Sequence, residues 1–151
     1  MIEEGSPFPA FDLEDQHGAR ISLDFLKGKK VVVYFYPKDD TSGCTVEACS
    51  FRDRLPDIQG AVVLGVSPDN VKSHKKFADK FSLNFSLLAD TDHGLADAIG
   101  VWVEKSMYGR KYMGIERTTF LLDGSGKVVK VWRKVKPQDH AVEVAAAVNA
   151  S

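Results

Sequence analysis

The two cysteines of the chain, Cys44 and Cys49, stand five positions apart in the stretch TSGCTVEACSF. A thiol acts as a nucleophile in its thiolate form, and at a reference pKa near 8.5 only about 3% is ionised at pH 7. Cys44 follows Gly43 at the expected start of a helix, where unpaired backbone N–H groups and the helix dipole favour an anion. We therefore expect an electropositive pocket at residue 44 that leaves the sulfur open to a small oxidant.

Two further residues can assist a thiolate that attacks a peroxide. Such a reaction needs donors aimed at the departing oxygen, because negative charge builds up on it. Thr41, three residues before Cys44, can bring a hydroxyl to the pocket, and Arg117, beside the expected strand TTFLL, can bring a guanidinium. Taken singly, each has a simpler explanation: a small buried cysteine, a turn or capping threonine, and an arginine in a surface ion pair. Taken together, the three residues favour a reactive thiol over these structural explanations.

The overall charge of the chain is close to zero. Lys and Arg number 20 against 21 Asp and Glu, which gives a formal net charge of −1. This balance attracts neither nucleic acid nor an anionic membrane surface. The start MIEEGSPFPAF holds no long apolar run, so we expect no signal peptide, no transmembrane segment and a cytoplasmic location. Small molecules or proteins are the expected partners.

Cysteine use in such a chain indicates catalysis or metal binding. In a reducing compartment, two nearby cysteines more often serve these roles than a structural disulfide. The histidines, His17, His74, His93 and His140, are scattered and lack the paired spacing of a zinc site. We expect no metal.

Strands and helices alternate along the chain. The run VVVYFY, residues 31–36, is apolar on both faces, and AVVLGVS, residues 61–67, follows it after a helical stretch, as in buried parallel strands. A short strand is expected at 85–90. The patterns predict helices at 44–55, ended by Pro56, and at 69–82, 93–101 and 139–150.

Two stretches predict β-hairpins. Residues 118–133 hold two β-rich runs around Asp123, Gly124 and Gly126, and residues 11–23 turn at His17 and Gly18. A parallel crossover combined with an antiparallel hairpin predicts an α/β fold with a mixed sheet. With 151 residues, 44% of them hydrophobic, and without a linker or repeat, we interpret residues 1–151 as one domain.

The segment PKDDTSGC resembles the signature of the peroxiredoxins: a proline, three variable residues, Thr or Ser, two more residues and the reactive cysteine. The match supplies Pro37, Thr41 and Cys44. The run CTVEAC is similar to the bacterioferritin comigratory protein, or peroxiredoxin Q, branch. Similarity continues through YFYPKDDT, GVWVEK, MYGRKYMGIERTTFLLD and VWRKVK, and so covers most of the chain.

This resemblance implies a thioredoxin-like fold, with a central mixed β-sheet flanked by helices and an N-terminal β-hairpin. It implies that Cys44 is the peroxidatic thiol, Cys49 the resolving thiol and Arg117 the active-site arginine. Members of the family reduce hydrogen peroxide and organic hydroperoxides and are usually recycled by thioredoxin or a similar dithiol. We accordingly expect a monomeric or weakly associating antioxidant peroxidase without metal, haem, flavin or nicotinamide.

One position departs from the family pattern. Members typically read Thr-Pro-Gly-Cys, whereas this chain has Ser42 where the proline would stand. Proline would fix φ and remove a backbone donor, so we expect Ser42 to leave the loop less ordered and peroxide binding slower.

The spacing of the thiols has a geometric consequence. Five residues along an α-helix separate two Cα atoms by about 8.7 Å. A disulfide needs less than about 7 Å, so the helix must unwind locally before Cys49 can reach a sulfenic acid on Cys44. The alternative is that Cys49 is a buried filler and that the resolving thiol comes from another molecule.

Nearby charged residues have structural explanations. We interpret Glu47 as a helix-start charge or the partner of an arginine, rather than as an acid or base. We expect Lys38, Asp39 and Asp40 to form a solvated loop.

Two rival functions remain. A thiol–disulfide oxidoreductase of similar fold would normally use C-x-x-C, whereas this chain has C-x₄-C. A redox sensor or holdase would use the same thiols but would expose apolar surface to a partner on oxidation, without turnover.

Overall fold

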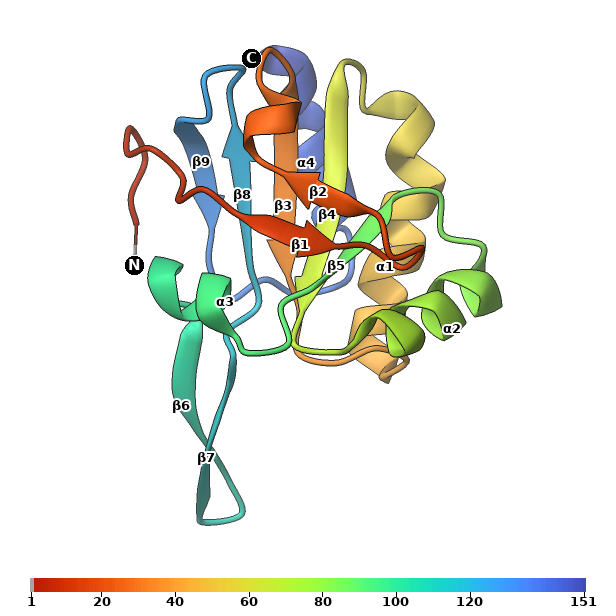
Figure 1. Cartoon of the computed structure of the whole chain (residues 1–151), viewed down its shortest axis with the longest axis vertical. Helices are drawn as coiled ribbons and strands as arrows, with labels where there is room; N and C mark the ends of the chain where they lie inside the picture. Colours follow the sequence, from red (N-terminus) through yellow and green to blue (C-terminus); the bar gives the residue numbers. More distant parts are fainter. Residues whose placement is uncertain (1) are drawn as a thin grey trace.

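The computed structural model describes residues 2–151, and its centre is a five-stranded mixed sheet with strand order β5-β4-β3-β8-β9 (Figure 1). Strand β3 pairs in parallel with β4 on one side and antiparallel with β8 on the other. The predicted parallel crossover and C-terminal hairpin are therefore confirmed. The strands of this sheet are β3 Lys30–Phe35, β4 Ala61–Ser67, β5 Ser86–Ala89, β8 Thr118–Leu122 and β9 Val128–Trp132.

Strand β3 is buried on both faces, as its sequence predicts. Val31, Val33 and Phe35 belong to one hydrophobic cluster of the core. Val32 and Tyr34, which alternate with them, belong to a second cluster on the opposite face. A strand with apolar residues on both faces must lie between two layers, so the helices cover the sheet from both sides.

The helices form the two outer layers. Helices α1 and α4 lie behind the sheet in Figure 1 and pack into the cluster that holds Tyr34, to which α2 also contributes. Helix α3 and the N-terminal hairpin lie on the other face. Among residues 2–151, no helix has the length and apolar character needed to cross a membrane. The bounds are α1 Ser42–Arg54, α2 Val71–Phe81, α3 Gly94–Ile99 and α4 His140–Ala150, with 3-10 turns η1 Asp24–Leu26 and η2 Leu55–Asp57.

Two small hairpins complete the fold. Strands β1 Asp12–Glu14 and β2 Arg20–Ser22 form the predicted N-terminal hairpin. Strands β6 Trp102–Met107 and β7 Arg110–Ile115 form a hairpin that the sequence analysis did not predict, and it projects below the body of the molecule in Figure 1.

The register of the sheet determines where Arg117 lies relative to α1. Phe35, the last residue of β3, pairs with Thr118, the first residue of β8. Arg117 directly precedes Thr118, so it lies at the end of the sheet where the C-terminus of β3 meets the N-terminus of β8. Helix α1 begins at the same end of the sheet, seven residues after Phe35. This topology brings Arg117 to the first turn of α1.

Candidate active site

Cys44 is the third residue of α1, and Thr41 is the N-cap residue with extended backbone angles. The helix begins two residues earlier than the sequence predicts, but its N-terminal end lies beside Cys44 as expected. The sulfur is not open to solvent, however, because Cys44 is only 2% exposed. The expectation of an exposed thiol was wrong because α1 turns this residue toward the sheet, into the cluster that contains Val32 and Ala48.

Arg117 joins the thiol to a buried carboxylate. Its Nη2 lies 3.3 Å from Cys44 Sγ, and its Nη1 donates to Glu47 Oε1 at 2.6 Å. Glu47 is fully buried one helical turn after Cys44, so both groups face the sheet. The interpretation of Glu47 as the partner of an arginine is confirmed. The fork of the guanidinium is thereby fixed by two contacts, which orient it over the sulfur.

The charges in the site perturb one another. Burial opposes the charged form of Arg117, but Glu47 and Cys44 more than offset this, and its pKa is raised. Burial raises the pKa of Glu47 from the ordinary value of 4.5 to about 7, although the guanidinium of Arg117 acts in the opposite direction. Its second oxygen, Oε2, has no hydrogen-bond partner among the described residues. The site therefore holds a carboxyl group that titrates near neutral pH.

A second cation was missed by the sequence analysis. Burial, and then repulsion from Arg117, lower the pKa of Lys105 on β6, while Cys44 acts in the opposite direction. Lys105 therefore belongs to the electrostatic surroundings of the thiol. Lys105 lies on a hairpin that the sequence analysis did not predict, so no local pattern pointed to it.

Gly43 has a steric role that also escaped prediction. A Cβ atom at this position would lie 3.3 Å from Arg117 Nη2 and 3.4 Å from Pro137 Cγ. These contacts are tighter than most real Cβ contacts, so a side chain at residue 43 would press on the guanidinium. Glycine lets Arg117 approach the start of α1.

Thr41 and Pro37 lie on the approach to the helix. Thr41 is exposed, and its Oγ1 donates to the carbonyl oxygen of Lys38 at 2.9 Å. The hydroxyl proton is thus engaged within the loop, whereas the oxygen lone pairs remain able to accept. Pro37 follows β3 and is half-buried.

Cys49 lies on the same continuous helix and is partly buried. Both cysteines are free thiols. In ideal helical geometry, their Cα atoms are about 8.7 Å apart, beyond the range of a disulfide. The structure thus has the helical form that the sequence predicts for the reduced chain.

Comparison with known proteins assigns this arrangement to a family. Residues 5–131 match the model of the AhpC/TSA family. The chain is 52% identical over 145 residues to a putative peroxiredoxin Bcp of Coxiella burnetii, covering 95% of this chain and 96% of the relative. It is 50% identical over 144 residues to peroxiredoxin Bcp of Bacillus subtilis, covering 94% and 92%. The chain belongs to the AhpC/TSA family of peroxiredoxins.

Solved structures agree with this assignment. The bacterioferritin comigratory protein of Xanthomonas campestris, studied for its alkyl peroxide reduction activity, superimposes with a TM-score of 0.88 at 46% identity, covering 93% of this chain and 90% of that one. A peroxiredoxin Q mutant of Xylella fastidiosa gives a TM-score of 0.94 at 36% identity, covering 99% and 97%. The predicted thioredoxin-like fold and the Bcp/peroxiredoxin Q branch are thus confirmed, and the protein is a thiol peroxidase.

The loop before Thr41 is less exposed in this peroxiredoxin than its charged sequence predicts. Lys38 and Asp40 are exposed, as expected, but Asp39 is only 7% exposed. The prediction of a fully solvated loop was wrong because Asp39 turns inward to hydrogen-bond partners on other elements. Sequence alone cannot distinguish this carboxylate from its neighbour.

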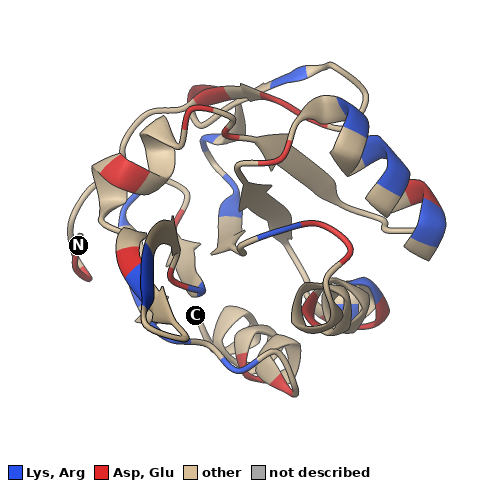
Figure 2. Ribbon diagram, turned by 90° about the horizontal axis from the view of Figure 1, so that it is seen from below, with Lys and Arg blue, Asp and Glu red and all other residues tan. Residues whose placement is uncertain are grey.

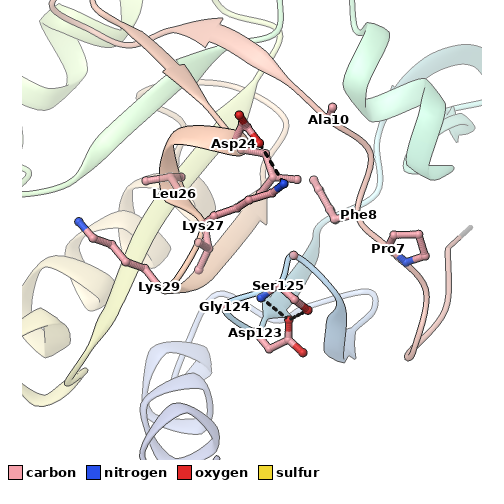
Figure 3. Close-up of a pocket in the computed structure, with 13 residues that line it drawn as sticks. Pro7, Phe8, Ala10, Asp24, Leu26, Lys27, Lys29, Asp123, Gly124 and Ser125 are labelled. Carbon is pink, nitrogen blue, oxygen red and sulfur yellow. Dashed lines mark hydrogen bonds and ion pairs between the residues drawn. The ribbon is translucent and has the colours of Figure 1, made fainter.

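An apolar cavity of the peroxiredoxin lies away from the thiols. It has a volume of about 210 Å³ between the N-terminal segment, the loop around Leu26 and the β8–β9 turn, with Phe8 and Val31 in its lining (Figure 3). Val31 is near the start of β3, whereas α1 follows the end of that strand. The cavity therefore lies toward the other end of the sheet and is no part of the thiol site.

The end of the sheet at which α1 begins carries charges of both signs (Figure 2). Several basic residues lie on α2 (Figure 2), and Lys75 and Lys76 among them are exposed. The positive charge beside Cys44 is thus local to the site, because it comes from Arg117 and Lys105.

Proposed function

We propose that Cys44 is the peroxidatic thiol and that Cys49 resolves its oxidised form within the same chain. The contact between Arg117 Nη2 and Cys44 Sγ, 3.3 Å at the N-terminal turn of α1, carries this proposal. A guanidinium and a helix N-terminus both favour a thiolate at this position.

In the first step, the Cys44 thiolate attacks one oxygen of the hydroperoxide. The S–O bond forms as the O–O bond breaks, the sulfur loses two electrons to the peroxide, and the second oxygen leaves as water or an alcohol after taking a proton. Arg117 stabilises the charge on the departing oxygen, and the lone pairs of Thr41 Oγ1 accept from the peroxide O–H. Pro37, half-buried in the loop between β3 and α1, is the third loop residue that we assign to the site.

In the second step, α1 unwinds locally and the thiolate of Cys49 attacks the sulfenic sulfur of Cys44. The S–S bond forms and hydroxide leaves as water after protonation. A dithiol such as thioredoxin then reduces the disulfide and is itself oxidised. Hydrogen peroxide and organic hydroperoxides are the proposed substrates, and antioxidant defence in the cytoplasm is the proposed role of a monomeric, single-domain protein.

Mass spectrometry of peroxide-treated protein tests the roles of the two thiols. The native chain should lose two hydrogen atoms and yield a peptide linked through Cys44 and Cys49. The Cys49→Ser variant should gain one oxygen at Cys44, and the Cys44→Ser variant should not react. A stable sulfenic acid or a mixed disulfide in the native chain would contradict the resolving role of Cys49.

A coupled assay with thioredoxin, thioredoxin reductase and hydrogen peroxide separates the proposal from a sensor or holdase. Continuous turnover supports the peroxidase, whereas a single stoichiometric oxidation supports a sensor. An assay with dithiothreitol in place of thioredoxin is the control. Turnover with dithiothreitol but not with thioredoxin would show that the peroxidase activity is correct and that the proposed reductant is wrong.

A further inference from the structure

A buried polar cluster surrounds Asp39, five residues before the reactive thiol. Its Oδ1 accepts from the hydroxyl of Tyr36 at 2.6 Å. Its Oδ2 accepts from the hydroxyl of Ser73 at 2.8 Å and lies 2.7 Å from His74 Nδ1. Burial, followed by the Asp39 carboxylate, raises the pKa of Tyr36 well above its ordinary value, so Tyr36 keeps its proton and donates.

The geometry of His74 fixes the number of protons in the cluster. This side chain is fully buried, and its Nε2 lies 2.9 Å from the carbonyl oxygen of Leu88, which can only accept. Nε2 must therefore carry a proton. A second proton must lie between Nδ1 and Oδ2 of Asp39, because otherwise two acceptors would meet at 2.7 Å. The pair is thus either imidazolium with carboxylate or imidazole with carboxylic acid, and its net charge is zero in both forms.

The cluster uses its polar atoms within the protein. Asp39, His74 and Asp69 lie close enough together to resemble a metal site. Both nitrogens of His74 and both oxygens of Asp39 are already hydrogen-bonded. Asp69 Oδ2 accepts from the backbone N–H of Asp39 at 2.8 Å and from the hydroxyl of Ser67 at 2.6 Å. The cluster is therefore a mechanical anchor rather than an ion site.

The anchor is attached to rigid elements. Ser73 and His74 stand in the first turn of α2, where the side chain of Asn70 accepts from the backbone N–H of Ser73 at 2.8 Å and caps the helix. Tyr36 directly follows β3, and Leu88 lies in β5. Asp39 is thus held by Tyr36 at the end of β3 and by α2, and His74 connects α2 to β5, so none of these contacts belongs to the reactive helix.

The anchor determines where α1 can begin. Directly after Asp39, Asp40 has a φ of 57°, a left-handed conformation that costs free energy in a non-glycine residue. Thr41 follows as the N-cap, and its carbonyl oxygen accepts from the backbone N–H of Thr45 at 2.8 Å. Contacts on both sides of Asp40 are needed to hold this turn, and on the N-terminal side Asp39 provides them.

We propose that Asp39 and His74 are positioning residues of the peroxidase, which hold the loop so that α1 places Cys44 against Arg117 and unwinding is confined to the residues after Asp40. This inference rests on the proposed function of the two thiols. Release of the anchor lowers the population of the helical form that reacts with peroxide. It does not lower the population of the unwound form in which Cys49 reaches Cys44.

Two rate measurements on the Asp39→Asn and His74→Gln variants test the proposal. The peroxide step is followed in a Cys49→Ser background, in which sulfenic acid accumulates, and the disulfide step is followed with both cysteines present. We expect the peroxide step to slow by about tenfold to a hundredfold, because small misplacements of reacting groups have effects of this size. We expect the disulfide step to be unchanged or faster. The double variant should resemble either single variant, since the two residues act as one unit.

Asp40→Asn is the matched control. It removes a neighbouring carboxylate whose pair with Lys80, at 2.9 Å, is exposed, and asparagine tolerates the left-handed backbone of this position. Its rates should equal those of the native chain. Equal slowing of both steps in the Asp39 and His74 variants, or rates like those of the control, would overturn the positioning role. A native chain that forms no disulfide would instead contradict the proposed function.

The protonation of His74 provides a readout that does not depend on activity. In ¹H–¹⁵N spectra of the native, reduced protein, His74 should show a proton on Nε2 and a strongly deshielded proton in the bond to Asp39. The Asp39→Asn variant should lose the deshielded signal, and Asp40→Asn should keep it. A native spectrum in which Nε2 carries no proton would refute the anchor.

Discussion

Arg117 connects the chemistry of the site to its stability. Its guanidinium contacts the sulfur of Cys44 and the carboxylate of Glu47. The carboxylate is fully buried, and one of its oxygens has no partner within residues 2–151. Burying an ionised carboxylate costs free energy, which one ion pair offsets only in part. The orientation of Arg117 is therefore obtained at the expense of folding stability.

Glu47 should make the stability of the reduced protein depend on pH. Its pKa rises from 4.5 in the unfolded chain to about 7 in the fold, so between these values the folded state binds more protons. The free energy of unfolding therefore decreases as the pH rises through this window, by up to about 3 kcal/mol relative to the Glu47→Gln variant. Urea unfolding of both proteins from pH 4.5 to pH 7 measures the difference.

The Gln variant also serves as an internal reference for other titrating groups. Burial, and then Arg117, lower the pKa of His140 from 6.5 to about 4, which makes the fold more stable as the pH rises through that range. This opposite trend is present in both proteins and cancels in their difference. Parallel stability curves for the two proteins would show that Glu47 titrates normally.

At the residue scale, the sequence predicted which side chains meet at the site better than it predicted their surroundings. Cys44 and Arg117 meet as expected, because a motif and a strand end identify them. The burial of Cys44 and Asp39 and the steric role of Gly43 were not predicted. These properties depend on contacts between elements far apart in the chain, which local patterns do not contain.

Helix α1 packs one face against the core, but its first turn lacks a side-chain cap. Its buried residues, Cys44, Glu47, Ala48 and Phe51, follow helical spacing. Its N-cap residue, Thr41, makes no side-chain hydrogen bond to the helix. The first turn consequently lacks a stabilising contact that an N-cap side chain commonly provides.

Replacing Ser42 by proline should strengthen this beginning. Ser42 is the first helical residue, a position where proline is well tolerated because its missing N–H would have no partner within the helix. We expect Ser42→Pro to stabilise the helical form by about 0.4–1 kcal/mol, by restricting the unwound chain. Sulfenic acid should form faster and the disulfide more slowly, as measured by rapid-quench mass spectrometry.

Ser42→Ala is the control for the hydroxyl, since it removes that group without fixing φ. Its rates should match those of the native chain. If Ser42→Pro also leaves both rates and the loop mobility unchanged, the family proline does not order this loop.

Among the elements, the sequence predicted the buried strands and the helices but not the β6–β7 hairpin. The buried elements have apolar residues at regular spacing, which their packing requires. The hairpin is largely exposed, and its turn uses Tyr108, a non-glycine residue with a φ of 52°, followed by Gly109. Without a buried face, it shows no alternation from which strands could be predicted.

At the scale of the whole molecule, the site is formed by two halves of the sheet. The parallel half supplies β3 and the loop to α1, and the antiparallel half supplies Arg117 before β8. The sequence predicted both halves but not their register, which brings Phe35 opposite Thr118. Register depends on the pairing of distant strands and therefore becomes visible only in the structure.

The same architecture should limit how far oxidation unfolds the chain. Phe51 stacks on Tyr34 of β3, with ring centroids 4.7 Å apart, and its ring also meets His140 of α4 at 5.9 Å. These contacts fix the end of α1 from Phe51 onward, whereas both thiols precede Phe51 in the helix. Disulfide formation should therefore release residues 42–50 and leave the rest of the helix and the sheet in place.

Hydrogen exchange measured by mass spectrometry checks this expectation. In the disulfide form, exchange should rise in residues 42–50 and stay unchanged in β3, β8 and residues 51–54, because the packing of Phe51 keeps those amides protected. Peroxide-treated Cys49→Ser is the control: it carries the sulfenic acid without the disulfide and should exchange like the reduced protein. Increased exchange throughout the sheet would mean that oxidation opens the whole fold, and no increase in residues 42–50 would mean that the thiols join without unwinding α1.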